Sequence, residues 1–185
     1  MQDRRSALVT GSTSGIGLVI ASGLAARGMN IVLNGFGDAA EIETQRLKLQ
    51  QAHGVEVLFH GADMSLQGAV EDLMAFGATH LGGIDVLVNN AGIQHVAPVD
   101  ACPVEKWNAI LPINLTAAFH TTRLALPHMK FNQWGRIVNI ASAHALVASP
   151  FKSAYVAAKH AIAGFTKTVA LEVAELGITA NAVCP

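Results

Sequence analysis

The residues with the clearest chemical potential are a tyrosine and a lysine in the apolar segment SAYVAAKHAIAGF, residues 153–165. Tyr155 is the only tyrosine in the chain, and Lys159 follows it four residues later. Residues four apart on a helix lie one above the other, so we expect the ammonium near the phenol. A nearby cation stabilises a phenolate, and such a tyrosine can exchange a proton with an alcohol or ketone. Alone, this spacing is more typical of a pair on a helix surface.

Polar residues in neighbouring segments could bind a substrate beside this tyrosine. Ser142 and His144 follow an apolar run just upstream, where a hydroxyl could hold a substrate oxygen against Tyr155. Gln94, His144 and Lys152 lie in segments that approach the tyrosine, and an amide, an imidazole and an ammonium suit a small anion. The alternative is that Gln94 and His144 are loop residues and that Lys152 only begins a helix.

A glycine-rich turn, TGSTSGIG at residues 10–17, joins the first apolar run to a helical pattern. Glycines let the backbone approach a ligand closely, and the helix N-terminus offers N–H groups and partial positive charge to a pyrophosphate. Because the strand and the helix both stand in the required places, the turn predicts nucleotide binding. The expected contacts within it are Gly11, Thr13, Ser14, Gly15, Ile16 and Gly17.

The segment NIVLNGFGD, residues 30–38, indicates which dinucleotide binds. At the end of such a strand an acidic residue holds a ribose diol and a basic residue holds a 2′-phosphate. Residues 34–37 carry neither charge, and Ser14 stands where the glycine turn could have been basic, so NAD is favoured over NADP. Phe36 could pack against the adenosine or be a core aromatic, whereas Asp38 is expected to cap the next helix.

Two later turns, GADMS at 61–65 and VNNAG at 88–92, end apolar runs and face the same predicted sheet edge. Asp63, beside Met64, could accept a hydrogen bond from the adenine amino group. Residues 89–92 of the second turn could line the adenosine ribose, and the expected contacts among them are Asn90, Ala91 and Gly92. A helix-capping aspartate and an ordinary turn are the alternatives.

Six short β-branched runs must position these residues, and longer helical patterns separate them. Strands without polar alternation, separated by helices, are typical of a parallel sheet buried on both faces. We therefore predict an α/β fold, a doubly wound Rossmann-like parallel sheet, as one domain over residues 1–185. The predicted strands are 6–10, 30–34, 55–59, 84–88, 136–141 and 178–184, and the predicted helices are 15–24, 38–53, 65–82, 103–130 and 152–176.

Composition narrows the class of partner. The chain is 51% hydrophobic and 14% charged with a formal net charge of -1, which argues against nucleic acid as a partner. No apolar run approaches the roughly 20 residues of a membrane span. Two cysteines and eight histidines show no metal-ligand spacing, so we expect no metal site and a reducing, cytoplasmic location. The predicted partner is a small molecule.

In combination, the motifs TGSTSGIG, NNAG, YVAAK and NAVCP resemble the short-chain dehydrogenase/reductase family over essentially the whole chain. In that family the tyrosine is the acid and base, the lysine holds the nicotinamide ribose, a serine orients the carbonyl and an asparagine anchors a proton-relay water. The resemblance assigns these roles to Tyr155, Lys159, Ser142 and Asn114, with NAD as cofactor.

Within the family, NAGIQH, LPHMK, NIASAHALVAS and KSAYVAAKH are most similar to members that oxidise D-3-hydroxybutyrate in ketone-body metabolism. The resemblance implies hydride transfer from (R)-3-hydroxybutyrate, giving acetoacetate, with the substrate carboxylate on Gln94, His144 and Lys152 and its oxygen at Ser142 and Tyr155. The alternatives are a relative acting on another small alcohol or ketone, and a nucleotide-binding fragment or sensor without turnover.

Two features depart from the family pattern. Pro112 lies two residues before Asn114, which predicts a kink or a helix start there. After NAVCP the family continues with a substrate lid and a final strand that residues 1–185 do not contain, so we expect a sheet lacking its C-terminal part.

Apolar residues spread around most of the two long predicted helices, whereas one sheet contact needs a single apolar stripe. This pattern and the family resemblance predict a homotetramer that buries the remaining faces. The residues concerned are Leu115, Ala117, Ala118, Phe119, Leu124 and Leu126 in the first helix and Val156, Ala157, Ala158, Ala161, Ile162, Phe165, Val169 and Leu171 in the second.

Overall fold

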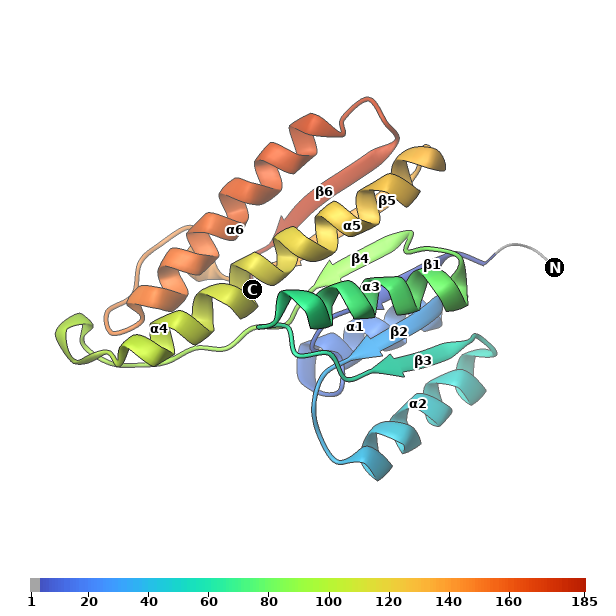
Figure 1. The fold of residues 1–185 in the computed structure, drawn as a ribbon, viewed down its shortest axis with the longest axis horizontal. Coiled ribbons are helices and arrows are strands. Elements are labelled where there is room, and N and C mark those ends of the chain that lie inside the picture. Colours follow the sequence, from blue (N-terminus) through green and yellow to red (C-terminus); the bar gives the residue numbers. More distant parts are fainter. Residues whose placement is uncertain (1–3) are drawn as a thin grey trace.

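The computed structural model describes residues 4–185, whose strands form one parallel sheet in the order β3-β2-β1-β4-β5-β6 (Figure 1). This confirms the predicted fold class, and each strand boundary lies within two residues of the predicted one. The chain winds outward from β1 to β3 and then returns to β4, so the order reverses between β1 and β4. The strands are β1 (Ser6–Val9), β2 (Asn30–Asn34), β3 (Val57–His60), β4 (Val86–Asn89), β5 (Gly135–Ile140) and β6 (Ile178–Val183).

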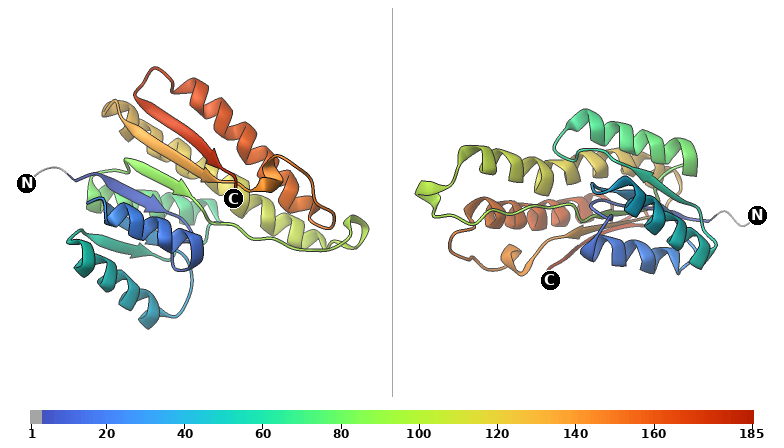
Figure 2. Two further views of the ribbon diagram at one scale, coloured as in Figure 1. Left: turned by 180° about the vertical axis from the view of Figure 1, so that it is seen from behind. Right: turned by 90° about the horizontal axis from the view of Figure 1, so that it is seen from below.

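Helices cover both faces of the sheet, as the two further views show (Figure 2). α1 (Gly15–Ala25) and α2 (Ala39–His53) pack on one face, and α3 (Gln67–Leu81), α5 (Ala117–Phe131) and α6 (Ser153–Glu172) pack on the other. Successive strand side chains point to opposite faces, and both faces are apolar because both are covered.

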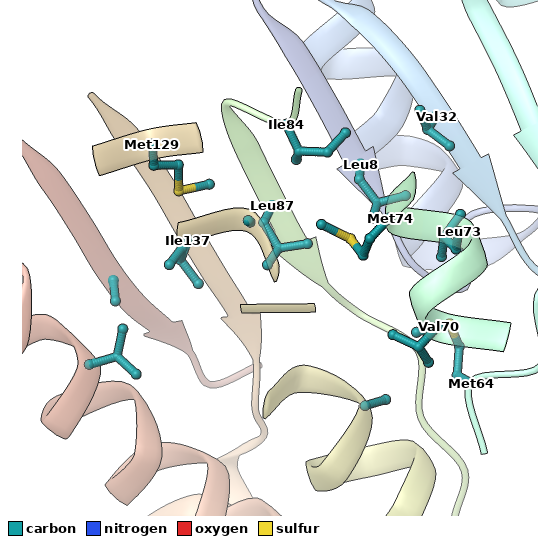
Figure 3. Packing of buried hydrophobic residues seen from close by; sticks show 14 of the residues in the cluster. Leu8, Val32, Met64, Val70, Leu73, Met74, Ile84, Leu87, Met129 and Ile137 are labelled. Atoms are coloured by element: carbon teal, nitrogen blue, oxygen red, sulfur yellow. The ribbon is translucent and has the colours of Figure 1, made fainter. Parts of the chain in front are cut away.

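The three central strands, β1, β4 and β5, contribute large side chains to the core beneath α3 and α5 (Figure 3). Leu8, Leu87 and Ile137, one from each of β1, β4 and β5, are fully buried there together with Leu73 of α3 and Met129 of α5. This packing sets the height of the helices over the sheet and therefore the positions of the loops at the strand ends.

The predicted helix over 103–130 is divided into three parts. α4 (Val104–Leu111) leads into a π-helical turn, η2 (Pro112–Thr116), which continues directly into α5. The N–H of Ala117 donates to the carbonyl of Pro112, the wider spacing that defines a π turn. The irregularity expected at Pro112 therefore takes the form of a π turn rather than a new helix start, and it contains Asn114.

The surface of α5 and α6 is less apolar than the sequence predicted. Most of the apolar residues that suggested an open interface pack within the chain, and Ala118 and Ile162 are examples of fully interior positions. Phe119 and Leu171 remain exposed, at 46% and 82%. Within residues 4–185, no helix is both long and apolar enough to cross a membrane.

Candidate active site

A cavity of about 640 Å³ opens beyond the carboxyl ends of the strands, where the strand order reverses. It collects most of the residues that the sequence singled out, from turns far apart along the chain. Three predicted residues, Asn114, His144 and Lys152, do not line it. The predicted residues that do are Gly11, Thr13, Ser14, Gly15, Ile16, Gly17, Phe36, Asp63, Met64, Asn90, Ala91, Gly92, Gln94, Ser142, Tyr155 and Lys159.

The glycine turn between β1 and α1 forms one wall of the cavity. Gly11 and Gly15 have φ angles of 61° and 54°, which favour glycine. A Cβ on Gly17 would lie 2.2 Å from the carbonyl oxygen of Gly11, so only glycine fits there. Ser14 precedes α1 without a side-chain capping bond, and the first turn of α1 holds no acidic residue. The N–H groups at this helix start are thus available to an anion, which fits a dinucleotide pyrophosphate.

Asparagine side chains hold this turn in place. Asn34, at the end of β2, is fully buried, and its Oδ1 accepts from the N–H of Gly11 at 3.3 Å. Its Nδ2 donates to the carbonyls of His60 and Ala62, both at 3.0 Å. The sequence reading used Asn34 only as an uncharged position and missed this structural role. A polar residue ending an otherwise apolar buried strand was the available signal.

Asn90, the residue that follows β4, holds the glycine turn from the other side. Its Nδ2 donates to the carbonyls of Thr10 and Gly11, both at 2.9 Å, and its N–H donates to the hydroxyl of Thr10. The amide that we expected to line a ribose is therefore committed to the glycine turn. Asn90 still borders the cavity beside Ala91 and Gly92.

The opposite end of the cavity is bordered by the turns after β2 and β3. Phe36 is 67% exposed, which excludes the interpretation as a core aromatic, and its carbonyl accepts from the hydroxyl of Thr13 at 2.8 Å. Asp63 accepts from the N–H of Ser65 at 2.8 Å through Oδ1, four residues before α3 begins, so it closes a turn rather than capping that helix. Asp38 does cap α2, accepting from two N–H groups of its first turn.

Tyr155 and Lys159 project from α6 into the cavity. The Lys159 Nζ lies 5.5 Å from the centre of the Tyr155 ring and donates to the carbonyl of Ile140, at the end of β5, at 2.7 Å. Lys159 is only 5% exposed, and this burial lowers its pKa to about 8. The strand end thus holds the ammonium next to the only phenol in the chain.

Ser142 lies two residues after β5, and its Oγ accepts from the N–H of His144 at 3.2 Å. The His144 ring stands edge-on to the Tyr155 ring, with centroids 6.0 Å apart. His144 therefore contacts both residues without lining the cavity itself. Lys152 stands immediately before α6, and of the three predicted carboxylate donors only Gln94 borders the cavity.

Asn114, in the π turn, is buried, and its side chain forms two hydrogen bonds with the loop that follows β4. Its Oδ1 accepts from the N–H of Ile93, and its Nδ2 donates to the carbonyl of Ile93, both at 2.9 Å. A second cavity of about 10 Å³ is lined by Asn114, Lys159 and Thr10 among others. That volume is close to the space of one water molecule, and the lining is polar.

Comparisons with known proteins agree with this architecture. The family model described as short chain dehydrogenase matches residues 5–185. A D-beta-hydroxybutyrate dehydrogenase of Cupriavidus necator is 60% identical over 186 residues, covering 100% of this chain and 71% of the relative. An enzyme of the same name from Rhizobium meliloti is 58% identical, covering 98% of this chain and 70% of the relative.

A solved structure shows the same fold in three dimensions. The crystal structure of a variant of actinorhodin polyketide ketoreductase with NADPH superposes with a TM-score of 0.93 at 39% identity, covering 100% of this chain and 71% of that one. The matched family model, the two relatives and this structure each extend over nearly the whole chain. The chain therefore belongs to the short-chain dehydrogenase family, whose members use a nicotinamide cofactor.

Proposed function

We propose that the protein is an NAD-dependent dehydrogenase that oxidises (R)-3-hydroxybutyrate to acetoacetate. The observation that carries this proposal is the single cavity in which the glycine turn meets Ser142, Tyr155 and Lys159. The names of the two relatives at 60% and 58% identity support the choice of substrate.

In this proposal each residue of the site has a distinct task. The bound nicotinamide supplies the hydride acceptor. Tyr155 takes the proton of the substrate hydroxyl, and Ser142 donates a hydrogen bond to the same oxygen. Lys159 stabilises the phenolate as a fixed cation. Asn114 borders the small cavity beside Lys159, and a water there would pass the proton onward.

The substrate carboxylate would be bound by Gln94, His144 and Lys152. Gln94 borders the cavity, and His144 lies against Ser142 and Tyr155. The carbonyl of Phe151 accepts from the N–H of Ala97 at 2.8 Å, which joins the loop carrying Gln94 to the segment before α6. A charged donor at Lys152 would complete a set of donors suited to a small anion.

NAD rather than NADP is proposed as the cofactor. Residues 34–37 offer no basic side chain to a 2′-phosphate, and the Asn34 amide is consumed by backbone hydrogen bonds. Steady-state rates with (R)-3-hydroxybutyrate and each cofactor test both parts of the proposal. We expect NADH formation with the (R) enantiomer and much slower turnover with NADP. Absence of turnover in a protein that binds NAD would refute the enzymatic function, and preference for an uncharged alcohol would refute the substrate.

We further propose a homotetramer that pairs through α5 and α6. The support is the exposure of Phe119 and Leu171 on these helices. Because part of the apolar surface is buried within the chain, the contact would be smaller than the sequence suggested. Light scattering on dilute protein tests this, and a stable active monomer would contradict it.

A further inference from the structure

A network of four buried polar side chains runs across one face of the sheet, from α5 over β4 and β5 to α6. The Thr121 hydroxyl of α5 donates to Asn89 Oδ1 of β4 at 2.7 Å. Asn89 Nδ2 donates to Asn139 Oδ1 of β5, and Asn139 Nδ2 donates to the Thr166 hydroxyl of α6, both at 2.8 Å. The four residues are between 0% and 9% exposed.

At α6, this network of hydrogen bonds ends at Thr166, which lies on the same face of the helix as Lys159. Thr166 follows Lys159 by seven residues, almost two helical turns, so both side chains point toward β5. Lys159 donates to the carbonyl of Ile140. The hydroxyl of Thr166 accepts from the side chain of Asn139, which is the neighbour of Ile140 in β5. Two adjacent positions of one strand therefore hold α6 at two points.

The α5 end repeats this spacing. Thr121 follows Asn114 by seven residues on the rod formed by the π turn and α5. Asn114 binds the loop after β4, while Thr121 binds Asn89 at the end of β4 itself. Each of the two helical segments thus carries one residue of the proposed site and, two turns further on, one threonine of the buried hydrogen-bond network.

The hydrogen bonds of this network oppose sliding and rotation of the helices more strongly than apolar packing alone does. The surrounding core is apolar, and apolar contacts tolerate small sliding or rotation of a helix. A buried hydrogen bond that is stretched leaves a polar group unsatisfied, so displacement is strongly opposed. Because the four side chains are linked by hydrogen bonds, a shift of α5 or α6 would stretch every bond of the network.

We propose that Thr121, Asn89, Asn139 and Thr166 form a positioning network that fixes α5 and α6 on the sheet so that Asn114 and Lys159 reach the active site. None of the four borders the main cavity, and only Asn89 lines the small cavity beside Asn114 and Lys159, so the network acts on the substrate through the helices and not by contact with it. The inference rests on the proposed function for its catalytic meaning.

Removal of one hydroxyl tests the network in the full chain. Thr166→Val keeps the side-chain shape, and we expect kcat for (R)-3-hydroxybutyrate to fall at least tenfold. The KM for NAD should stay within about twofold, because the glycine turn is untouched, and Thr166→Ser should restore kcat. Thr168→Val is the matched control, since the Thr168 hydroxyl on the exposed side of α6 bonds only within its own helix, to the carbonyl of Gly164.

A second readout does not depend on turnover. The Cε resonance of Lys159 in lysine-labelled protein, assigned with Lys159→Arg, follows ionisation of the ammonium. If α6 loosens in Thr166→Val, Lys159 gains water and its pKa rises from about 8 toward 10.5. A wild type without turnover would remove the proposed function, while this titration would still decide the positioning role.

The far end of the network gives an independent variant if Thr166→Val does not fold. Thr121→Val should change kcat and the Lys159 titration in the same directions, by less. Thr122→Val is its control, because the Thr122 hydroxyl is buried and has no hydrogen-bond partner among residues 4–185. A lower melting temperature with unchanged kcat and unchanged Lys159 titration in Thr166→Val and Thr121→Val would overturn the proposal.

Discussion

The two halves of the sheet build their parts of the site in opposite ways. In the half formed by β1, β2 and β3, the glycine turn presents backbone to the cavity, and this backbone is held by the side chain of Asn34 of β2 and, from the other half, by that of Asn90 after β4. In the half formed by β4, β5 and β6, the reactive groups are side chains, and backbone holds them, as the Ile140 carbonyl holds Lys159.

This difference predicts how each half responds to substitution. A wall made of N–H groups and glycines is sensitive to added volume, because a new Cβ displaces the ligand or the turn. Side chains that do chemistry are sensitive to the loss of one functional group at constant shape. Substitutions of the two kinds should therefore separate binding of the dinucleotide from turnover.

The largest effect is expected from Tyr155→Phe, which removes only the phenolic oxygen. Loss of the acid and base should lower kcat by roughly 10³-fold, within the range of general acid–base catalysis. Dinucleotide affinity should stay nearly unchanged, because the glycine turn does not involve the phenol. Steady-state rates beside a fluorescence titration with NADH measure both quantities, and near-normal turnover would remove Tyr155 from the mechanism.

Gly17→Ala should disturb the glycine turn in the other half of the sheet and weaken dinucleotide binding. The added Cβ would lie 2.2 Å from the Gly11 carbonyl oxygen and 2.5 Å from Asn90 Nδ2, so the turn must move. We expect dinucleotide affinity to fall by about 10- to 100-fold, from an overpacking cost of about 1–3 kcal/mol. Gly164→Ala on α6 is the control, since its Cβ would meet nothing within 4 Å, and its affinity should match the wild type. Equal affinities for all three proteins would show that the turn does not bind the nucleotide.

Lys152→Ala tests the proposed carboxylate site at the edge of the second half. Loss of a charge-assisted hydrogen bond costs on the order of 1.5–3 kcal/mol, so KM for 3-hydroxybutyrate should rise at least about tenfold. KM for an uncharged short secondary alcohol should hardly change. If both substrates are affected equally, Lys152 has a structural role at the start of α6.

Lys159→Met removes the cation that is proposed to act in catalysis, so turnover should fall sharply. Its effect on stability is the smallest free-energy change in this series, and the variant should be more stable than the wild type. Burial lowers the pKa of Lys159 in the folded protein to about 8, whereas the unfolded chain keeps its proton up to about 10.5. Unfolding therefore takes up a proton between these values, and this residue makes stability rise with pH across that window.

At pH 7 the buried ammonium is a cost to the fold. Replacing it with a methionine should stabilise the apo-protein by about 1–2 kcal/mol, because the cost of lowering the Lys159 pKa from 10.5 to about 8 is removed and is only partly offset by the lost hydrogen bond to Ile140. Urea unfolding at several pH values measures the difference between wild type and variant. A variant that is less stable at pH 7, or a difference that does not shrink between pH 8 and 10, would contradict the burial cost.

Local pattern was sufficient to predict the fold and the glycine turn. The alternation of apolar runs and helices specifies a parallel sheet with little ambiguity, and the carboxyl ends of its strands must meet at one edge. Gly11, Asp63 and Ser142 were therefore expected together, and one cavity contains all three.

Side-chain partners depended on geometry that spacing does not encode. Asn34 and Asn90 are separated by 56 residues, and both bond to Gly11 only because β1 lies between β2 and β4. The sequence likewise predicted a kink or a helix start at Pro112 but not the π turn that forms there. The apolar faces of α5 and α6 were misread in part, because periodicity does not show how many neighbours a helix has.

A crystal structure with NAD and acetoacetate tests the central claim most directly, namely that both halves of the sheet serve one cavity. We predict the pyrophosphate on the N–H groups of residues 15–17, and the keto oxygen of acetoacetate within hydrogen-bond distance of the Tyr155 and Ser142 hydroxyls. A nicotinamide ring outside the cavity, or acetoacetate bound away from Tyr155, would contradict the account.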